Sequence, residues 1–367
     1  MIGKSFSKPS PEIIVNNQQI VILIALFLSS AIPLPALAQN EANNRSVESA
    51  TWRFEFDNDV FFGKDNKISS GWSLQKHSAV AESWDALENI PGFVRRWGSA
   101  IPTLTRDGLV YRAGIAIGQV IQTPADLSRS DLIEDDVPYA GALTLQASWY
   151  AYNDDEFRGF EVTAGVVGPP SLAEQTQKVI HNLIGSDDPK GWDHQLSTEP
   201  VINFNYMRKR KVWRKGNPAG FAFDAAINGN VGLGNLFTQA SAAIEFRFGH
   251  NLPGGFVYVP DPIGLSMHYL ASLKPANHQS ASIYATLVLR GTAFAYNIFL
   301  DGNTFRDSHS AAKEPLVGLV IAGLHYEQKN WAIHLGAMVS SDNVDTDKVP
   351  AAEDRELLGT IDIEWRF

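Results

Sequence analysis

The last eight residues, TIDIEWRF at 360–367, alternate strictly between apolar and polar side chains. The odd-numbered residues from Ile361 to Phe367 are apolar, and the even-numbered residues from Thr360 to Arg366 are polar or charged. Successive side chains of a strand point to opposite faces, so the pattern predicts a β-strand with one apolar and one polar face. Alternation alone does not decide the class of protein, because a soluble β-sandwich has the same pattern.

The same period of two recurs upstream, in alternating segments separated by turn-rich stretches. Phe54 and Phe56 alternate with Glu55 and Asp57, for example, and the remaining segments follow the same rule. The pattern predicts twelve strands, which begin near residues 51, 68, 109, 141, 156, 199, 219, 238, 281, 315, 330 and 355. The connections near 79–108 and 249–280 are long, and we expect them to hold small helices, a plug or a further strand pair.

The N-terminal segment has the pattern of an export signal. Lys4 and Lys8 precede the apolar run VILIALFLSSAIPLPALAQ, which includes an A-x-A site ending at Ala38. We therefore expect residues 1–38 to be a signal peptide cleaved after Ala38, and residues 39–367 to form the mature domain. A single membrane anchor is the alternative, and the two prolines near the end of the run disfavour it.

Composition excludes several classes of function. The 367 residues carry a net charge of −10, which argues against a nucleic-acid partner because phosphate binding requires a positive surface. The sequence contains no cysteine, so disulfides and thiolate metal sites are excluded.

The export signal, the alternating segments and the terminal aromatic residue together favour an outer-membrane protein. An aromatic residue that ends an alternating strand resembles the assembly signal of bacterial outer-membrane barrels. Backbone groups in lipid must close their hydrogen bonds within the protein, so we predict an all-β fold, a closed antiparallel transmembrane β-barrel of about twelve strands. An even number of strands places both chain ends on the periplasmic side.

One segment breaks the strand period. SLAEQTQKVIHNLIG at 171–185 predicts a short extracellular helix, with a capping box at Ser171 and Glu174 and a stop at Gly185. Leu172, Val179, Ile180 and Leu183 give it an apolar face. Gln177 and His181 are spaced i, i+4 and therefore share another part of its surface.

Polar residues at the same end of the predicted barrel suggest a hydrolytic site. Asn58, Asp59 and Asp187 offer the hard oxygen ligands that Ca²⁺ prefers. His181 near such an ion could deprotonate water, and Gln177 could orient the imidazole or the water. Taken singly, each residue has a simpler explanation, because Asn and Asp favour turns and surface loops commonly carry solvated charges.

Six stretches in order make the chain resemble the bacterial outer-membrane lipid A 3′-O-deacylase family over nearly all of the mature sequence. They are FDNDVF at 56–61, ISSGWSL at 68–74, GQVIQTPAD at 118–126, DDVPYAGAL at 135–143, QTQKVIHNLIGSDDPKGWDHQLSTEP at 175–200 and LDGNTF at 300–305. The resemblance implies a Ca²⁺-dependent site between the outer barrel wall and a short helix. It also implies histidine as the base and water as the nucleophile.

Carried over by position, the resemblance assigns roles to six residues. It implies catalytic roles for His181, Gln177, Ser69 and Asp59. It implies that Asn58, Asp59 and Asp187 bind Ca²⁺, with Asp188 as a second choice for the last ligand. The chain departs from the family pattern at Ile68-Ser69-Ser70-Gly71, Gln122 and Val137. The expected substrate is lipid A in lipopolysaccharide, and the expected partner during biogenesis is the barrel assembly machinery. We expect a monomer.

Two other functions remain open at this stage. Inward residues such as Glu245, Arg247 and Glu364 could line a pore or fill a salt-bridged lumen, which would make the protein a non-enzymatic barrel. Alternatively, Ser69 could serve as the nucleophile of a barrel phospholipase rather than as a donor to the oxyanion.

Overall fold

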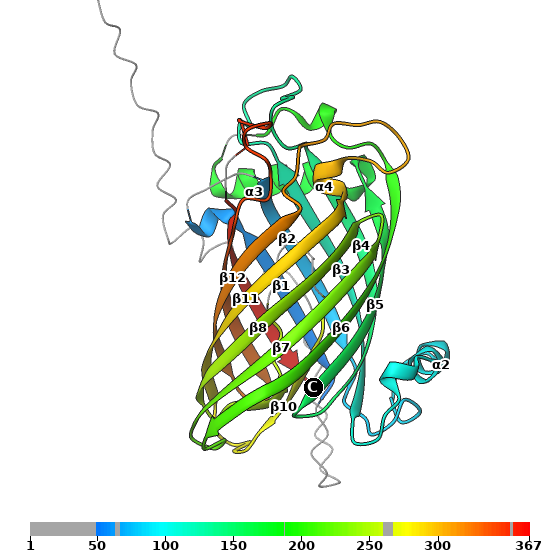
Figure 1. The fold of residues 1–367 in the computed structure, drawn as a ribbon, viewed down its shortest axis with the longest axis vertical. Coiled ribbons are helices and arrows are strands. Elements are labelled where there is room, and N and C mark those ends of the chain that lie inside the picture. Colours follow the sequence, from blue (N-terminus) through cyan, green and yellow to red (C-terminus); the bar gives the residue numbers. More distant parts are fainter. Residues whose placement is uncertain (1–48, 63–66, 187, 260–266, 353–354) are drawn as a thin grey trace, which may run out of the picture.

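The computed structural model describes residues 49–62, 67–186, 188–259, 267–352 and 355–367. Within these residues, twelve strands close into one antiparallel barrel (Figure 1): β1 Thr51–Asn58, β2 Lys67–His77, β3 Val110–Thr123, β4 Ala140–Tyr152, β5 Glu156–Val167, β6 Glu199–Gly216, β7 Phe221–Gly234, β8 Phe237–His250, β11 Ser282–Asn297, β12 Leu316–Glu327, β13 Trp331–Ser340 and β14 Leu357–Arg366. β1 pairs with β14 to close the barrel. The prediction of a closed twelve-stranded barrel is confirmed.

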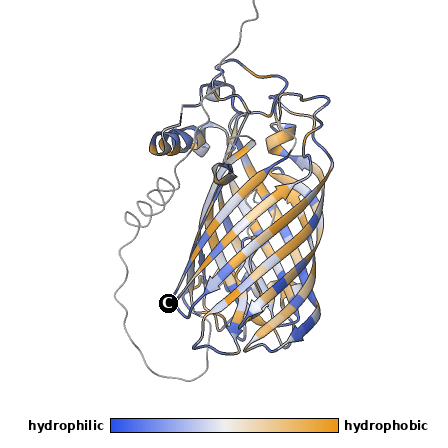
Figure 2. Ribbon diagram, turned by 90° about the vertical axis from the view of Figure 1, so that its left-hand side faces the viewer, coloured by the Kyte–Doolittle hydropathy of each residue, from blue (hydrophilic) through white to orange (hydrophobic). Residues whose placement is uncertain are grey.

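Alternation along each strand separates a polar lumen from an apolar outer surface. In β1, Arg53, Glu55 and Asp57 are buried in the lumen, whereas the residues between them are partly exposed on the outside. Figure 2 shows hydrophobic residues interleaved with more hydrophilic ones along the strands. An apolar exterior is what lipid requires, and it comes directly from the period of two in the sequence.

The lumen is packed with ion pairs. Arg53 Nη2 lies 2.7 Å from Glu364 Oε1, and both side chains are 1% exposed. Lys209 Nζ lies 2.6 Å from Glu245 Oε1, and Arg247 pairs with Asp224. A buried charge is costly unless it is paired, so these pairs hold the facing strands in one register.

A hairpin from the β8–β11 connection fills the lumen further. β9 (Pro253–Phe256) and β10 (Ala271–Pro275) form a separate two-stranded sheet, as the length of the connection suggested. Arg53 Nη1 donates to Tyr269 O at 3.0 Å, and the backbone N–H of His268 donates to Glu161 Oε2 at 3.0 Å. The segment therefore acts as a plug attached to the barrel wall.

The short turns near 153–155, 217–220 and 328–330 mark one end of the barrel as periplasmic. Among the described residues, the opposite, extracellular end carries two helices, α3 (Ala173–Ile184) and α4 (Ile298–Asp301), and three 3₁₀ turns, η1 (Asp59–Phe62), η3 (Pro169–Ser171) and η4 (Trp192–His194). A further 3₁₀ turn, η2 (Pro102–Leu104), lies at the periplasmic end. Gly185 ends α3 with φ 76°, as predicted. The predicted capping box is wrong: α3 begins after Leu172, which has φ 60°, and no side chain caps the helix.

One helix lies beside the periplasmic end of the barrel. α2 (Gly92–Ala100) belongs to the long β2–β3 connection, where the sequence predicted a small helix (Figure 1). None of the helices in the described part of the chain has both the length and the apolar content needed to cross a bilayer.

Candidate active site

Four residues form a row across the outer wall near the extracellular end. The strand register places Asn58 of β1 beside Ser70 of β2, Ser70 beside Ile121 of β3, and Ile121 beside Gly141 of β4. Ser70 shares the outer face with Trp72 and Leu74, because it lies two and four residues before them in β2. Asn58 and Ser70 are 6% and 3% exposed, although lipid-facing positions elsewhere are open, so other segments cover this row.

α3 packs against one end of this row. A Cβ atom on Gly141 would lie 2.1 Å from Ala173 Cβ, so the absence of a side chain there allows the helix to approach the wall closely. Ile121 belongs to a small apolar cluster with Ala173, Tyr139 and Trp192. The first turn of α3 is therefore seated directly on β3 and β4.

The buried face of α3 carries the predicted catalytic pair. Ala173, Gln177 and His181 follow each other at intervals of four and are all buried, Gln177 at 2% and His181 at 4% exposure. Leu172, Val179 and Leu183 are instead 53%, 58% and 48% exposed. The helix thus turns its polar face to the barrel wall and its apolar face outward, the reverse of a helix on a soluble protein.

Trp192 fixes the orientation of the Gln177 amide. The indole Nε1 of Trp192 donates to Gln177 Oε1 at 2.9 Å, and an indole can only donate, which identifies the accepting atom as the oxygen. Among the described residues, Gln177 Nε2 has no hydrogen-bond partner although it is buried. This amide is therefore a donor that a substrate oxygen or a water could satisfy.

Further hydrogen bonds hold the start of α3 in place. Trp72 Nε1 donates to Gln119 Oε1 at 2.9 Å, and Gln119 Nε2 donates to Ser171 O at 2.6 Å. On the outer side of the helix, Lys178 Nζ donates to Glu174 Oε1 at 2.6 Å, and this hydrogen bond raises the pKa of Lys178. The bonds connect the outer faces of β2 and β3 to the helix that carries His181.

The structure places some of the predicted site residues and not others. Asn58 ends β1 on the outer wall, and Asp59, 3% exposed, begins η1 beside it. Ser69 lies in β2, but its side chain is outside the described part, and so is the whole of Asp187. Within the described residues, no group of three or more histidine and acidic side chains is arranged to hold a metal ion.

Sequence reasoning missed two residues of this site. Ser70 was noted only as the neighbour of Ser69, yet its buried hydroxyl has no partner among the described residues and stands in the row beside Asn58. Trp192 lay in the 175–200 motif without a role. The motif at 175–200 continues beyond the predicted helix, and this could have indicated that Trp192 contacts a side chain of the helix.

Other residues that the sequence singled out stabilise the extracellular end. Asn303 of LDGNTF donates from Nδ2 to Ser197 O at 2.9 Å, and so attaches this segment to the chain that follows α3. Gln122, one of the departures from the family pattern, donates to Pro138 O at 3.0 Å and to Phe299 O at 2.7 Å. Val137, another departure from the family pattern, is fully buried in an apolar cluster. These residues are structural.

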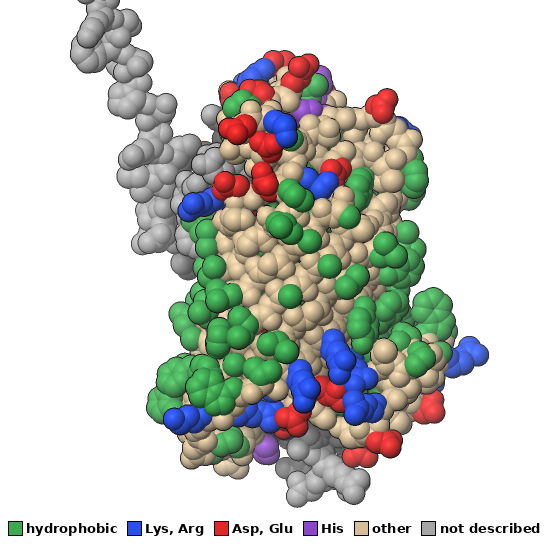
Figure 3. Space-filling view, in the orientation of Figure 1, with side chains coloured by type: hydrophobic (Ala, Val, Ile, Leu, Met, Phe, Trp, Pro, Cys, Tyr) green, Lys and Arg blue, Asp and Glu red, His purple; other side chains and the backbone are tan. Residues whose placement is uncertain are grey.

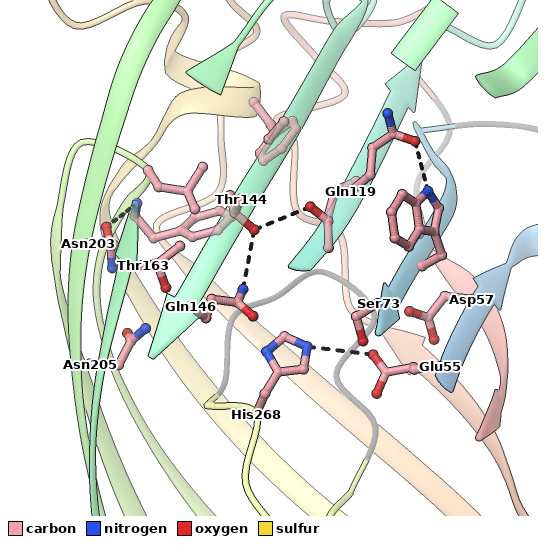
Figure 4. A pocket seen from close by; sticks show the side chains of 18 residues that line it. Glu55, Asp57, Ser73, Gln119, Thr144, Gln146, Thr163, Asn203, Asn205 and His268 are labelled. Atoms are coloured by element: carbon pink, nitrogen blue, oxygen red, sulfur yellow. Dashed lines mark hydrogen bonds and ion pairs between the residues drawn. The ribbon is translucent and has the colours of Figure 1, made fainter. Parts of the chain in front are cut away.

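A second polar site lies inside the barrel. A cavity of about 40 Å³ is lined by Glu55, Asp57, Gln146, His268 and further polar and apolar side chains. Figure 4 shows how these labelled side chains lie around it. His268 Nε2 lies 3.8 Å from Glu55 Oε1 across it. The volume holds a few water molecules and no acyl chain, so the outer-wall site is the better candidate for chemistry on a lipid.

Comparisons with known proteins agree with this fold. A family model described as outer membrane protein LpxR matches residues 22–367. The solved structure of LpxR from Salmonella typhimurium has a TM-score of 0.67 at 13% identity, over 86% of this chain and all of that chain, which supports the fold alone. The autotransporter β-domain of Bordetella BrkA has a TM-score of 0.41 at 8% identity, over 88% of this chain and all of that one, too low to carry an argument. No curated protein sequence matches the chain.

Proposed function

The chain belongs to the outer membrane protein LpxR family, and from this premise we propose that it is an esterase that hydrolyses the 3′-O-linked acyl-oxyacyl chain of lipid A. The observation that carries the proposal is the buried face of α3, where Gln177 and His181 are held against the outer barrel wall. A site on the outside of a barrel is open to lipids that diffuse in the same membrane. The motif resemblance indicates lipid A as the particular lipid.

The exposed face of α3 favours lateral access. Leu172, Val179 and Leu183 point away from the barrel, at the extracellular end where the acyl chains of the outer leaflet begin. An apolar face on an exposed helix is stable in contact with acyl chains. The substrate ester can therefore reach the contact between α3 and the wall without leaving the membrane.

In the proposed reaction, His181 accepts a proton from water as the oxygen attacks the ester carbonyl carbon. The carbonyl oxygen becomes an oxyanion, to which Gln177 Nε2 donates a hydrogen bond. The intermediate collapses, the bond to the 3′ sugar oxygen breaks, and His181 returns the proton to that oxygen. The products are one acyl-oxyacyl carboxylic acid and a lipid A with a free 3′ hydroxyl.

The donor set beside this helix fits Ca²⁺. Asn58, at the end of β1, offers an amide oxygen, and Asp59, at the start of η1, offers a carboxylate; both residues are buried, and Asp187 would complete the set from outside the described residues. When bound, Ca²⁺ supplies positive charge that stabilises an oxyanion. The buried hydroxyl of Ser70, next to Asn58, can donate in the same region.

The remaining expectations belong to the same proposal. The signal peptide would be cleaved after Ala38, in a segment outside the described residues, and the barrel assembly machinery would insert the mature chain as a monomer. Both agree with a β-barrel that belongs to a family of outer-membrane proteins.

Removal of calcium tests the proposal. Purified protein in detergent micelles with lipid A and Ca²⁺ is expected to release an acyl-oxyacyl acid, and a calcium chelator is expected to abolish the release. Fatty-acid analysis measures both, and excess Ca²⁺ should restore activity. Equal release with the chelator would contradict a calcium-dependent reaction, and release only from glycerophospholipids would contradict the substrate.

A further inference from the structure

α2 is attached to the outside of the barrel wall near the periplasmic end, at the opposite end of the barrel from α3. Trp149 of β4 donates from Nε1 to Val94 O at 2.9 Å, and the Trp97 ring stacks on Trp149 with centroids 5.9 Å apart. Gly98 is buried beneath Trp84, where a Cβ atom would lie 2.5 Å from the ring. One face of the helix is therefore fixed to the wall.

A second face of α2 is apolar and exposed. Phe93 and Trp97 are one turn apart, and 58% and 55% of their surfaces are exposed. Arg96 is also exposed, on the other side of the aromatic pair from the wall. A helix with a wall-facing side, an exposed aromatic side and a cationic side has the composition of an interfacial membrane helix.

The level of α2 along the barrel is set by the strand register. Trp149 is beside Phe160 of β5, and Phe160 is beside Tyr206 of β6. Along the outer face of β6, the residues change from Phe204 above this level to Arg208 and Arg210 below it, toward the periplasm. The row that anchors α2 thus lies next to the first cations on this strand, and the exposed Val212 and Trp213 follow them toward the turn. Aromatic residues are enriched at the boundary between acyl chains and headgroups, and cations bind the phosphates there.

The aromatic side of α2 is continuous with the lipid-facing wall. The Trp97 ring stacks on the ring of Trp149. The ring centroids of Trp149 and Phe160 are 6.3 Å apart, and Phe160 stacks on Phe204 with centroids 6.4 Å apart. Phe204 is 41% exposed on the outer surface of β6. Figure 3 shows Lys and Arg side chains gathered on the barrel between this region and the periplasmic end.

We propose that α2 and the periplasmic end of β6 form a docking surface for the periplasmic leaflet of the membrane, with anionic glycerophospholipid as the occupant. Phe93 and Trp97 would insert among the acyl chains, and Arg96, Arg208 and Arg210 would bind the phosphate groups of the lipids. The protein as a whole is acidic, with a net charge of −10, so this cationic patch is a local exception. The surface is independent of the extracellular site.

Site-directed labelling tests the depth of α2. Because the sequence has no cysteine, single cysteines replace Phe93, Trp97 or, as the control on the polar side, Ser99, and each carries a nitroxide label in the folded full-length barrel. The accessibility of each nitroxide to oxygen and to a water-soluble nickel chelate is measured in vesicles of phosphatidylcholine and phosphatidylglycerol. The labels at 93 and 97 should be more accessible to oxygen than to the chelate, and the label at 99 should be more accessible to the chelate. The Phe93→Cys variant keeps the Trp97–Trp149 contact, so its helix remains attached.

Lipid selectivity tests the cationic half of the proposal. The triple variant Arg96→Gln, Arg208→Gln, Arg210→Gln should lose the enrichment of phosphatidylglycerol over phosphatidylcholine in the purified protein, on the order of fivefold for each arginine. The matched control replaces three exposed extracellular arginines, Arg129, Arg306 and Arg355. Nickel access at 93 and 97 would overturn the docking surface and favour a protein partner in the periplasm. Unchanged enrichment in the triple variant would overturn anionic-lipid binding.

Discussion

At the scale of single residues, the candidate site depends on the side-chain amide of Gln177, whose orientation is set by Trp192, a residue outside α3. Trp192 holds Gln177 Oε1 and leaves Nε2 directed elsewhere, which makes Gln177 a donor. The helical spacing of Gln177 and His181 could be predicted from the sequence. The contact with Trp192 could not, because it joins residues fifteen positions apart through an irregular loop.

Replacing Trp192 with Phe should therefore weaken catalysis without unfolding the barrel. Loss of one hydrogen bond of about 1 kcal/mol corresponds to roughly a fivefold lower kcat, with KM little changed. In the double variant with Gln177→Ala, the loss should be less than the sum of the two single losses, because both remove the same interaction. Trp213→Phe, at an exposed site on β6, is the control. Full additivity would contradict the positioning role of Trp192.

At the scale of elements, the strands were predictable and the placement of the helix was not. Every predicted strand of the barrel begins within two residues of the observed start, because the period of two is a local property of each segment. The row from Asn58 to Gly141 depends on the register between neighbouring strands, and no local pattern encodes that register. The outward apolar face of α3 also escaped prediction, because hydrophobic periodicity does not say whether lipid or protein covers a face.

The close seating of α3 on Gly141 gives a prediction for this element. Gly141→Ala places a Cβ atom 2.1 Å from Ala173 Cβ and 2.5 Å from Ser171 Oγ, so the helix must move. A displacement of about 1 Å at a catalytic group can cost ~10²-fold in rate, and we expect a loss of this order while the barrel still folds. Electrophoretic mobility with and without heating checks the fold, and lipid A hydrolysis checks the rate.

The control for this change is Gly291→Ala on β11, where an added Cβ would meet no atom within 4 Å. It should keep full activity. Wild-type activity in Gly141→Ala would mean that the contact between α3 and β4 does not position the reacting groups.

At the scale of the whole molecule, the barrel is a filled scaffold, and the proposed site lies on its outside. Ion pairs such as Arg53–Glu364 and the β9–β10 plug occupy the lumen. The sequence left a conducting pore and a packed lumen equally open, because inward charges are compatible with both. The short distances between oppositely charged side chains in the structure favour the packed lumen.

Electrical measurement tests this packing. In planar bilayers, the purified protein should give no stable open-channel steps, because the plug and the paired charges of the described residues occupy the lumen. Regular conductance steps from well-folded protein would contradict a closed lumen and revive the pore function.

The most direct test of the account compares lipid A from cells that make the wild-type protein with lipid A from cells that make His181→Ala. With Ca²⁺ present, the wild type should shift the mass of lipid A by the loss of one acyl-oxyacyl unit. His181→Ala should be slower by ~10²–10⁴-fold, because general-base assistance is lost, and its lipid A should keep its mass. The same loss of mass with His181→Ala, or no loss with correctly folded wild type, would contradict the central claim.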